Sequence, residues 1–164
     1  MSLWLLIGCA SSGQLSSTAA QNEASPAQTL THYQFSDLDN LMVKEPRLAA
    51  VFLHAPWCQF CRNMEHTTLR NDEVVKLLNE HYYFISFDGE QEEDVSFRGH
   101  TFHYQPTGRN TGTHELATAL GTMDNALTYP TLVLLDEEYN IIFQHNAFLN
   151  SEEMIGVLQR AMKP

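Results

Sequence analysis

An almost unbroken apolar run, LAAVFLHA at residues 48–55, constrains the fold more than any other feature of this sequence. A short run of this kind is typical of a strand that is buried on both faces, and such a strand needs packed layers on each side of its sheet. Further strands are predicted at 82–88 and 131–135, and residues 140–144 are expected to form the hairpin partner of the last one. These strands predict a mixed sheet at the centre of the domain.

Helical segments fill the intervals between the strands. Apolar residues at helical spacing predict five helices, at 36–47, at 58–67, and beginning near residues 71, 113 and 151. The expected N-caps are polar residues with short side chains, namely Ser36, Asn71 or Asp72, and Ser151. Strands that alternate with helices predict an α/β fold, in which helices cover both faces of the central mixed sheet.

Composition narrows the classes of partner. The chain has 164 residues, enough for a single domain, and 43% of them are hydrophobic. It is acidic, with 20 Asp and Glu against 9 Lys and Arg and a formal net charge of −11. Because nucleic-acid binding depends on clustered cations, we expect no nucleic-acid partner. The same charge disfavours docking of the folded surface onto anionic lipid, and no apolar run reaches the length of about 18 residues that a membrane-spanning helix needs.

The beginning of the chain differs from the rest. A short apolar stretch ends in LIGC at residues 6–9, and small residues follow, as at a processing site. This motif resembles the lipobox of bacterial lipoproteins, which implies a lipid anchor at Cys9; the alternative is a chance cysteine in a tail. We predict a signal-peptide remnant at 1–8 and a lipidated flexible tether at 9–31, because so polar a segment cannot bury enough surface to offset its chain entropy. The globular domain is predicted at 32–164.

The chemistry is expected at the motif APWCQFC, residues 55–61, which follows the first strand directly. Pro56 and the end of the strand force a turn, so we expect Cys58 at the first position of the next helix. Free N–H groups and the helix dipole favour a negative sulfur there, and cysteine pKa values at such places fall from ~8.5 to ~3.5–7.5. Cys61 lies one turn further along the same face, close enough to form a disulfide. The spacing therefore supplies an attacking thiolate, Cys58, and a thiol that resolves the mixed disulfide, Cys61.

Two other functions remain open for this cysteine pair. The pair and a histidine, either His66 or one more distant, would make a zinc- or copper-binding module, although structural zinc sites use four ligands and typically two such pairs. A purely structural disulfide is the second alternative, but it would close a loop of only four residues and so add little stability by loop entropy.

Two motifs resemble the active site of the thioredoxin superfamily. The first is Trp57-Cys58-x-x-Cys61 after an apolar strand, and the second is Tyr129-Pro130-Thr131 immediately before the strand TLVLLD. The resemblance implies a thioredoxin-like fold, a cis Pro130 that faces the cysteine pair, and a substrate-binding surface formed by Trp57, Tyr129 and Pro130.

Over residues 36–163 the chain resembles the thioredoxin-like domains of bacterial extracytoplasmic thiol:disulfide interchange proteins. This resemblance implies a thiol–disulfide oxidoreductase that needs no cofactor or metal beyond its redox-active Cys58–Cys61 disulfide. Its partners would be protein thiols and disulfides and an upstream redox protein. Together with the lipobox, it implies a membrane-tethered lipoprotein on the periplasmic side of an inner or outer membrane.

The sequence departs from thioredoxins in two places. Phe52 occupies the position of their buried acid, so the proton acceptor for the resolving thiol must come from elsewhere; the candidates are His54, Glu65 and His66. The dipeptide Gln59-Phe60 between the cysteines carries no imidazole to stabilise the Cys58 thiolate. We therefore expect a couple that is less oxidising than those of the dedicated oxidants, and a reductase.

Residues 89–112 form an insertion before the Pro130 strand. Its start is acidic, which predicts a solvated face, and an aromatic stretch follows that includes Phe97, Phe102 and Tyr104. These aromatic residues are expected either to cover the core or to form a partner-specific lip beside the cysteines. A third functional hypothesis is therefore a non-catalytic interaction domain that uses this insertion.

Overall fold

The computed structural model describes Met1 and residues 28–163. Its helices are α1 (Phe35–Lys44), α2 (Gln59–His66), the 3₁₀ turn η1 (Thr68–Arg70), α3 (Asp72–His81), α4 (Glu115–Gly121) and α5 (Ser151–Ala161). The main strands are β1 (Leu48–His54), β2 (Tyr82–Asp88), β7 (Thr131–Leu135) and β8 (Ile141–His145). No helix within the described part of the chain is long and apolar enough to span a membrane.

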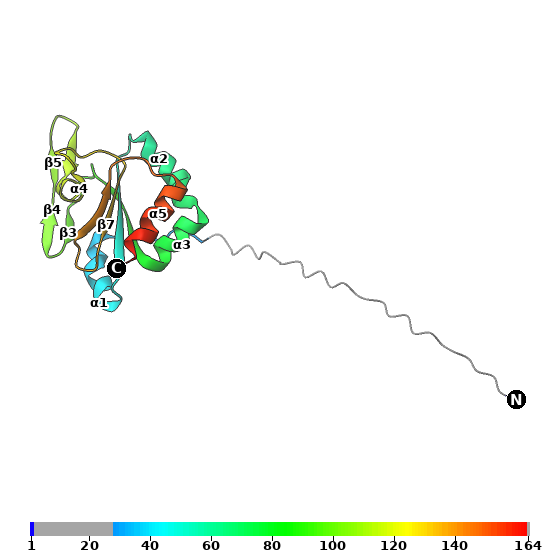
Figure 1. The fold of residues 1–164 in the computed structure, drawn as a ribbon. Helices are drawn as coiled ribbons and strands as arrows, with labels where there is room; N and C mark the ends of the chain where they lie inside the picture. Colours follow the sequence, from blue (N-terminus) through cyan, green and yellow to red (C-terminus); the bar gives the residue numbers. More distant parts are fainter. Residues whose placement is uncertain (2–27, 164) are drawn as a thin grey trace.

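The four main strands form one sheet in the order β2-β1-β7-β8 (Figure 1). β1 runs parallel to β2 and antiparallel to β7, and β8 pairs antiparallel with β7. The mixed sheet and its hairpin are therefore confirmed. β1 lies inside the sheet, and its residues 49–53 are fully buried, as the apolar run predicts.

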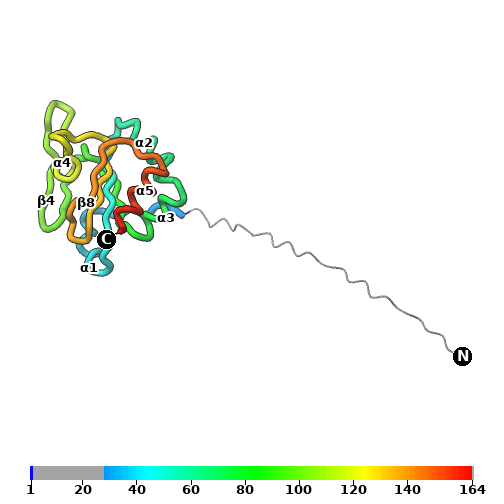
Figure 2. The backbone as a smooth tube through the Cα atoms, in the orientation of Figure 1, coloured from blue at the N-terminus to red at the C-terminus, as the bar shows by residue number. Residues whose placement is uncertain are grey.

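Helices pack on both faces of this sheet, as predicted (Figures 1 and 2). Ala50 and Phe52 of β1 point into a core formed with α2, α3 and α5. Val51 and Leu53 point to the opposite face, into a core formed with α1 and α4. The alternation follows from the strand period of two, and it places the cysteine pair in the core on the α3 and α5 side.

The helix starts agree only in part with the predicted caps. Asn71 caps α3 as expected, since its Oδ1 accepts from the N–H groups of Glu73 and Val74. The prediction of Ser151 is wrong, because Asn150 caps α5 and completes a capping box with Glu153. Ser36 is not a cap either, since Gln34 precedes α1 without a side-chain cap. The helix expected to begin near residue 113 is α4, which begins at Glu115 and is capped by His114.

The insertion consists of two short hairpins that the sequence did not predict. β3 (Val95–Phe97) pairs with β4 (His100–Phe102), and β5 (Tyr104–Pro106) pairs with β6 (Gly112–His114). Arg98 and Gly99 both have positive φ, as the tight turn between β3 and β4 requires. Phe97 is buried against Phe35, with 5.1 Å between ring centroids, and Phe102 packs on the same core. Phe97 and Phe102 therefore cover the core beneath α1 and α4, whereas Tyr104 belongs to neither core.

The predicted signal-peptide remnant, Cys9 and most of the predicted tether lie outside the described residues. Within the described part, Thr29 and Thr31 exchange hydrogen bonds with the Asn79 side chain of α3. The Tyr33 N–H donates to the Phe84 carbonyl at 2.9 Å. The chain thus runs along the outer edge of β2 before it enters α1.

Candidate active site

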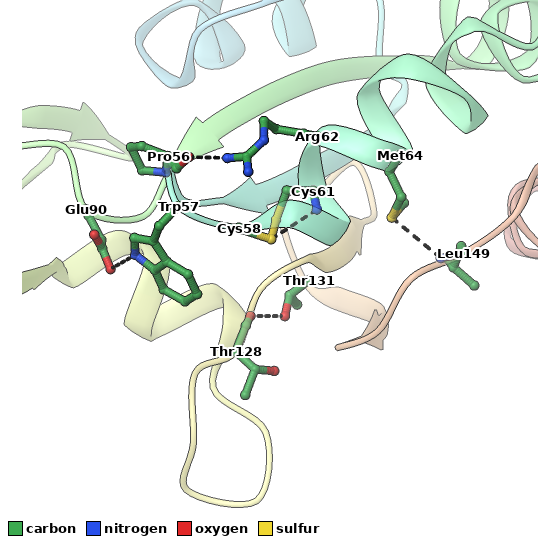
Figure 3. The surroundings of a disulfide bond; sticks show 10 residues. All are labelled: Pro56, Trp57, Cys58, Cys61, Arg62, Met64, Glu90, Thr128, Thr131 and Leu149. Carbon is green, nitrogen blue, oxygen red and sulfur yellow. Dashed lines mark hydrogen bonds between the residues drawn. A yellow bond between two sulfur atoms is a disulfide. The ribbon is translucent and has the colours of Figure 1, made fainter.

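Cys58 and Cys61 form a disulfide at the start of α2 (Figure 3). Cys58 is the N-cap of the helix, one position before the predicted one, and Gln59 is the first helical residue. The backbone N–H of Cys61 donates to the Cys58 sulfur at 3.0 Å. Both cysteines are buried, with exposed fractions of 4% and 1%. The helix start thus directs an N–H group at the outer sulfur, as the sequence argument requires.

The loop that carries the cysteines is fixed by backbone and side-chain hydrogen bonds. The Cys58 N–H donates to the Ala55 carbonyl at 3.0 Å, which closes a turn directly after β1. The Arg62 guanidinium reaches back to the Pro56 carbonyl at 2.7 Å (Figure 3). Trp57 on this loop and Phe60 in the first turn of α2 project into solvent, with exposed fractions of 64% and 65%. Two aromatic side chains therefore flank a buried disulfide.

The second motif lies beside the first. The peptide bond between Tyr129 and Pro130 is cis, as the resemblance implied, and Pro130 is buried. The Thr131 hydroxyl donates to the Thr128 carbonyl at 2.7 Å and closes this turn. Thr131 pairs with Leu53 near the end of β1, so the antiparallel pairing brings Pro130 to the end of the sheet from which the cysteine loop departs.

Tyr129 and Trp57 form an aromatic pair at this end of the sheet. Their ring centroids are 6.0 Å apart at an interplanar angle of 70°. The Tyr129 hydroxyl is buried and has no hydrogen-bond partner among the described residues. Burial raises the pKa of Tyr129 above its ordinary value, and the nearby carboxylates of Glu90 and Asp88 raise it further. The hydroxyl is therefore neutral throughout the pH range in which thiol exchange proceeds.

Sequence reasoning missed one residue of the site, Glu90. Its Oε1 accepts a hydrogen bond from the Trp57 indole N–H at 2.9 Å (Figure 3). Glu90 belongs to the acidic start of the insertion, which was predicted to be a solvated face. A contact between residues 33 positions apart leaves no local signal in the sequence.

None of the three candidate proton acceptors hydrogen-bonds to a cysteine sulfur in the described part of the chain. His54 stacks on the fully buried Phe52, with 5.7 Å between ring centroids. Glu65 and His66 lie in the last turn of α2, where they line a cavity together with Leu30 and other residues. Among residues 28–163, no three His, Cys, Asp or Glu side chains gather in a way that would hold a metal ion.

Comparison with known proteins identifies the fold. Residues 34–162 match the family model of the thioredoxin-like domain, and a search of curated proteins finds no match. Among solved structures, DsbH oxidoreductase is similar with a TM-score of 0.59 at 17% identity, over 93% of this chain and 94% of that one.

Two further solved structures are similar to this chain. A thioredoxin from Thermus thermophilus is similar with a TM-score of 0.58 at 18% identity, over 82% of this chain and 88% of its own. The oxidised C-terminal domain of Neisseria meningitidis DsbD is similar with a TM-score of 0.51 at 15% identity, over 76% and 90%. These structures share the fold, which confirms the thioredoxin-like architecture predicted from the sequence. The chain therefore belongs to the thioredoxin-like domain family, and with its cysteine pair at the start of α2 it is a thiol–disulfide oxidoreductase.

Proposed function

We propose that Cys58 is the attacking thiolate and Cys61 the resolving thiol in the reduction of protein disulfides. The observation that carries this assignment is the hydrogen bond from the Cys61 N–H to the Cys58 sulfur, because a donor at this distance stabilises a thiolate at the helix N-cap. Cys61 is the less exposed of the two cysteines, at 1% against 4% for Cys58, and we assign to it the resolving step.

The reaction transfers two electrons from the cysteine pair to the substrate. The Cys58 thiolate attacks one sulfur of a substrate disulfide, and the other substrate sulfur leaves as a thiolate that takes up a proton. Cys61 then loses its proton and attacks the Cys58 sulfur. The second substrate thiol is released, and the Cys58–Cys61 disulfide remains. An upstream dithiol protein must reduce this disulfide before the next cycle.

Trp57, Tyr129 and Pro130 form the proposed substrate-binding surface. Since both sulfurs are buried, a partner must approach closely at the surface beside the exposed Trp57 to reach Cys58. Pro130 stands at the start of β7 beside this surface, and an extended substrate segment would add there as a short strand through backbone hydrogen bonds.

The reducing direction and the location are also proposals. A reductase is supported by Gln59-Phe60, since neither residue supplies an imidazole to stabilise a Cys58 thiolate. A lipid-anchored, periplasmic protein is supported by the lipobox-like motif at Cys9 and by the structural likeness to DsbH and to a DsbD domain. Palmitate labelling of cells that express the wild type or Cys9→Ser tests the anchor, and label on both proteins would contradict it.

Insulin reduction by wild type, Cys58→Ser and Cys61→Ser tests the assigned roles. We expect activity in the wild type only, and a covalent complex with a substrate that accumulates only in Cys61→Ser. Equal activity in wild type and Cys58→Ser would overturn the proposal. Metal content after purification under reducing conditions tests the metal-binding alternative, which a stoichiometric ion would favour.

A further inference from the structure

We infer that Gly89 and Glu90, the first two residues of the insertion, are positioning residues for substrate docking: they hold the side chains of Tyr129 and Trp57 beside the disulfide. The inference deepens the proposed function and rests on it. It joins the insertion to the chemistry at the cysteine pair, although no residue of the insertion hydrogen-bonds to either sulfur in the described structure.

Glu90 fixes the exposed indole of Trp57. A tryptophan that is 64% exposed on a loop has several staggered rotamers open to it. The hydrogen bond from its N–H to Glu90 selects one of them. Glu90 is itself held, because its backbone N–H donates to Asp88 Oδ1 at 2.9 Å. The backbone that carries the acceptor carboxylate is therefore fixed at the end of β2.

Gly89 provides the space for the Tyr129 ring. It is buried, and its backbone is held at both ends: its N–H donates to the His54 carbonyl, and its carbonyl accepts from the His114 N–H, each at 2.8 Å. A Cβ atom on residue 89 would overlap the Tyr129 hydroxyl and lie 2.7 Å from Cζ of the same ring. Only glycine admits the observed position of the tyrosine, since the backbone cannot retreat.

Glu90 and Gly89 act on the two rings of one aromatic pair: Glu90 holds Trp57, and Gly89 makes room for Tyr129. Because Trp57 and Tyr129 contact each other, displacement of either side chain changes the surface around Cys58. A protein substrate covers this surface, so its binding depends on the pair being in place. The expected consequence is a change in KM for protein disulfides, with a smaller change in kcat.

The first experiment compares Glu90→Ala with Glu90→Gln, which keeps an acceptor oxygen, and with Glu92→Ala, a matched loss of charge. All are made in a Trp4→Phe background, so that Trp57 is the only tryptophan. Loss of the hydrogen bond from Trp57 to the exposed Glu90 carboxylate should raise KM for insulin roughly 2–10-fold in Glu90→Ala. Acrylamide quenching of Trp57 should rise in the same variant, while Glu90→Gln and Glu92→Ala stay close to wild type. Quenching and KM that are unchanged in Glu90→Ala, or an equal effect in all three variants, would overturn the role of Glu90.

The second experiment tests Gly89 by a double-mutant cycle. Gly89→Ala should raise KM in the wild type, because the new methyl group displaces the Tyr129 ring. In a Tyr129→Val background the same substitution should change KM by less than about twofold, since the side chains no longer overlap. Effects that simply add would show that Gly89 acts independently of Tyr129 and would overturn its role. Thermal unfolding of each variant verifies that it is folded.

Failure of the proposed function is distinguishable from failure of this inference. If the wild type reduces no protein disulfide, the proposed function fails and the inference about docking falls with it. If the wild type is active and quenching of Trp57 does not depend on residue 90, only the inference fails.

Discussion

At the scale of single residues, the two cysteines differ in what surrounds each sulfur. The Cys58 sulfur accepts a backbone N–H at the N-cap, whereas Cys61 is 1% exposed in the helix that follows. This asymmetry was predictable from spacing, because a strand followed by proline and a CxxC motif forces a helix start. The role of Glu90 was not predictable, because it depends on a hydrogen bond to Trp57 that forms only when the chain has folded.

We predict that the reduced Cys58 thiol has a pKa within the range of ~3.5–7.5 seen at helix N-termini, below the ordinary value of ~8.5. The physical reason is the N–H group that stabilises its thiolate. The rate of iodoacetamide alkylation against pH measures this pKa, and the Cys61→Ser variant assigns it to Cys58. A midpoint near ~8.5 would contradict the assignment of Cys58 as the nucleophile.

Tyr129→Phe should raise the free energy of unfolding by about 1 kcal/mol, because it removes a buried hydroxyl that has no partner among the described residues. Tyr82→Phe is the matched control, since the buried Tyr82 hydroxyl donates to the Leu158 carbonyl at 2.7 Å. That variant should lose about 1 kcal/mol. Urea unfolding of both proteins measures the difference, and a loss of stability in Tyr129→Phe would contradict the prediction.

At the scale of elements, the insertion is part of the core rather than an appendage. Phe97 of β3 is 6% exposed and contacts Phe35 of α1 and Tyr139, with 5.1 Å between ring centroids in each case. Strands of three residues carry too few positions to show a period of two, so neither hairpin of the insertion could be predicted. The longer strands were found because burial on both faces makes them continuously apolar.

Phe97→Ala should therefore lower the free energy of unfolding by about 3–5 kcal/mol, the usual cost of emptying a buried aromatic site. Phe102, which is half-buried in the neighbouring strand β4, is the control, and Phe102→Ala should cost clearly less. Urea denaturation measures both changes. Equal, small losses would show that the hairpin of β3 and β4 contributes nothing to the core beneath α1.

Helix α4 begins with a titratable cap, His114. Its Nδ1 accepts from the Leu116 N–H at 3.2 Å, so Nε2 carries the proton and faces the Glu93 carbonyl. Burial lowers the pKa of His114, while the Glu93 carbonyl and the carboxylates of Glu115 and Asp94 partly oppose the shift. A protonated imidazole has no acceptor and loses the cap. Since the folded pKa lies below the unfolded one, the stabilising contribution is complete above pH ~6.5 and is lost as the pH falls below that value.

His114→Asn keeps a capping oxygen and removes the titration. The free energy of unfolding should fall less steeply between pH 7 and pH 5 in this variant than in the wild type. Chemical denaturation at several pH values measures the two slopes. Because His103 and several carboxylates also titrate, the difference between the two proteins is the quantity of interest, and identical slopes would contradict the prediction.

At the scale of the whole molecule, charge is the dominant property. The 20 acidic residues exceed the 9 Lys and Arg, and five of the acids lie at 88–94, next to Trp57. A negative field around a site raises the rate of encounter with cationic substrates. This property is visible in the composition, but the position of the acidic run beside the disulfide required the fold.

We predict that a disulfide peptide with flanking lysines is reduced at least about tenfold faster in kcat/KM than the same peptide with glutamates, at low salt. The difference should shrink as the Debye length falls from about 30 Å at 0.01 M to about 8 Å at 0.15 M ionic strength. A peptide with glutamines, whose rate should hardly respond to salt, is the control. Equal rates for the lysine and glutamate peptides at low salt would contradict electrostatic steering.

The segment that leads into the domain and the cysteine pair lie at opposite ends of the central sheet. Thr29 and Thr31 are bound by Asn79 in the last turn of α3, near the start of β2, whose first residue pairs with Leu48. The sulfurs follow His54, at the other end of β1, and a strand of seven residues spans about 20 Å. If the domain is anchored through its leading segment, as proposed, the cysteine pair would lie on the side away from the anchor. There it is accessible both to the electron donor and to the electron acceptor.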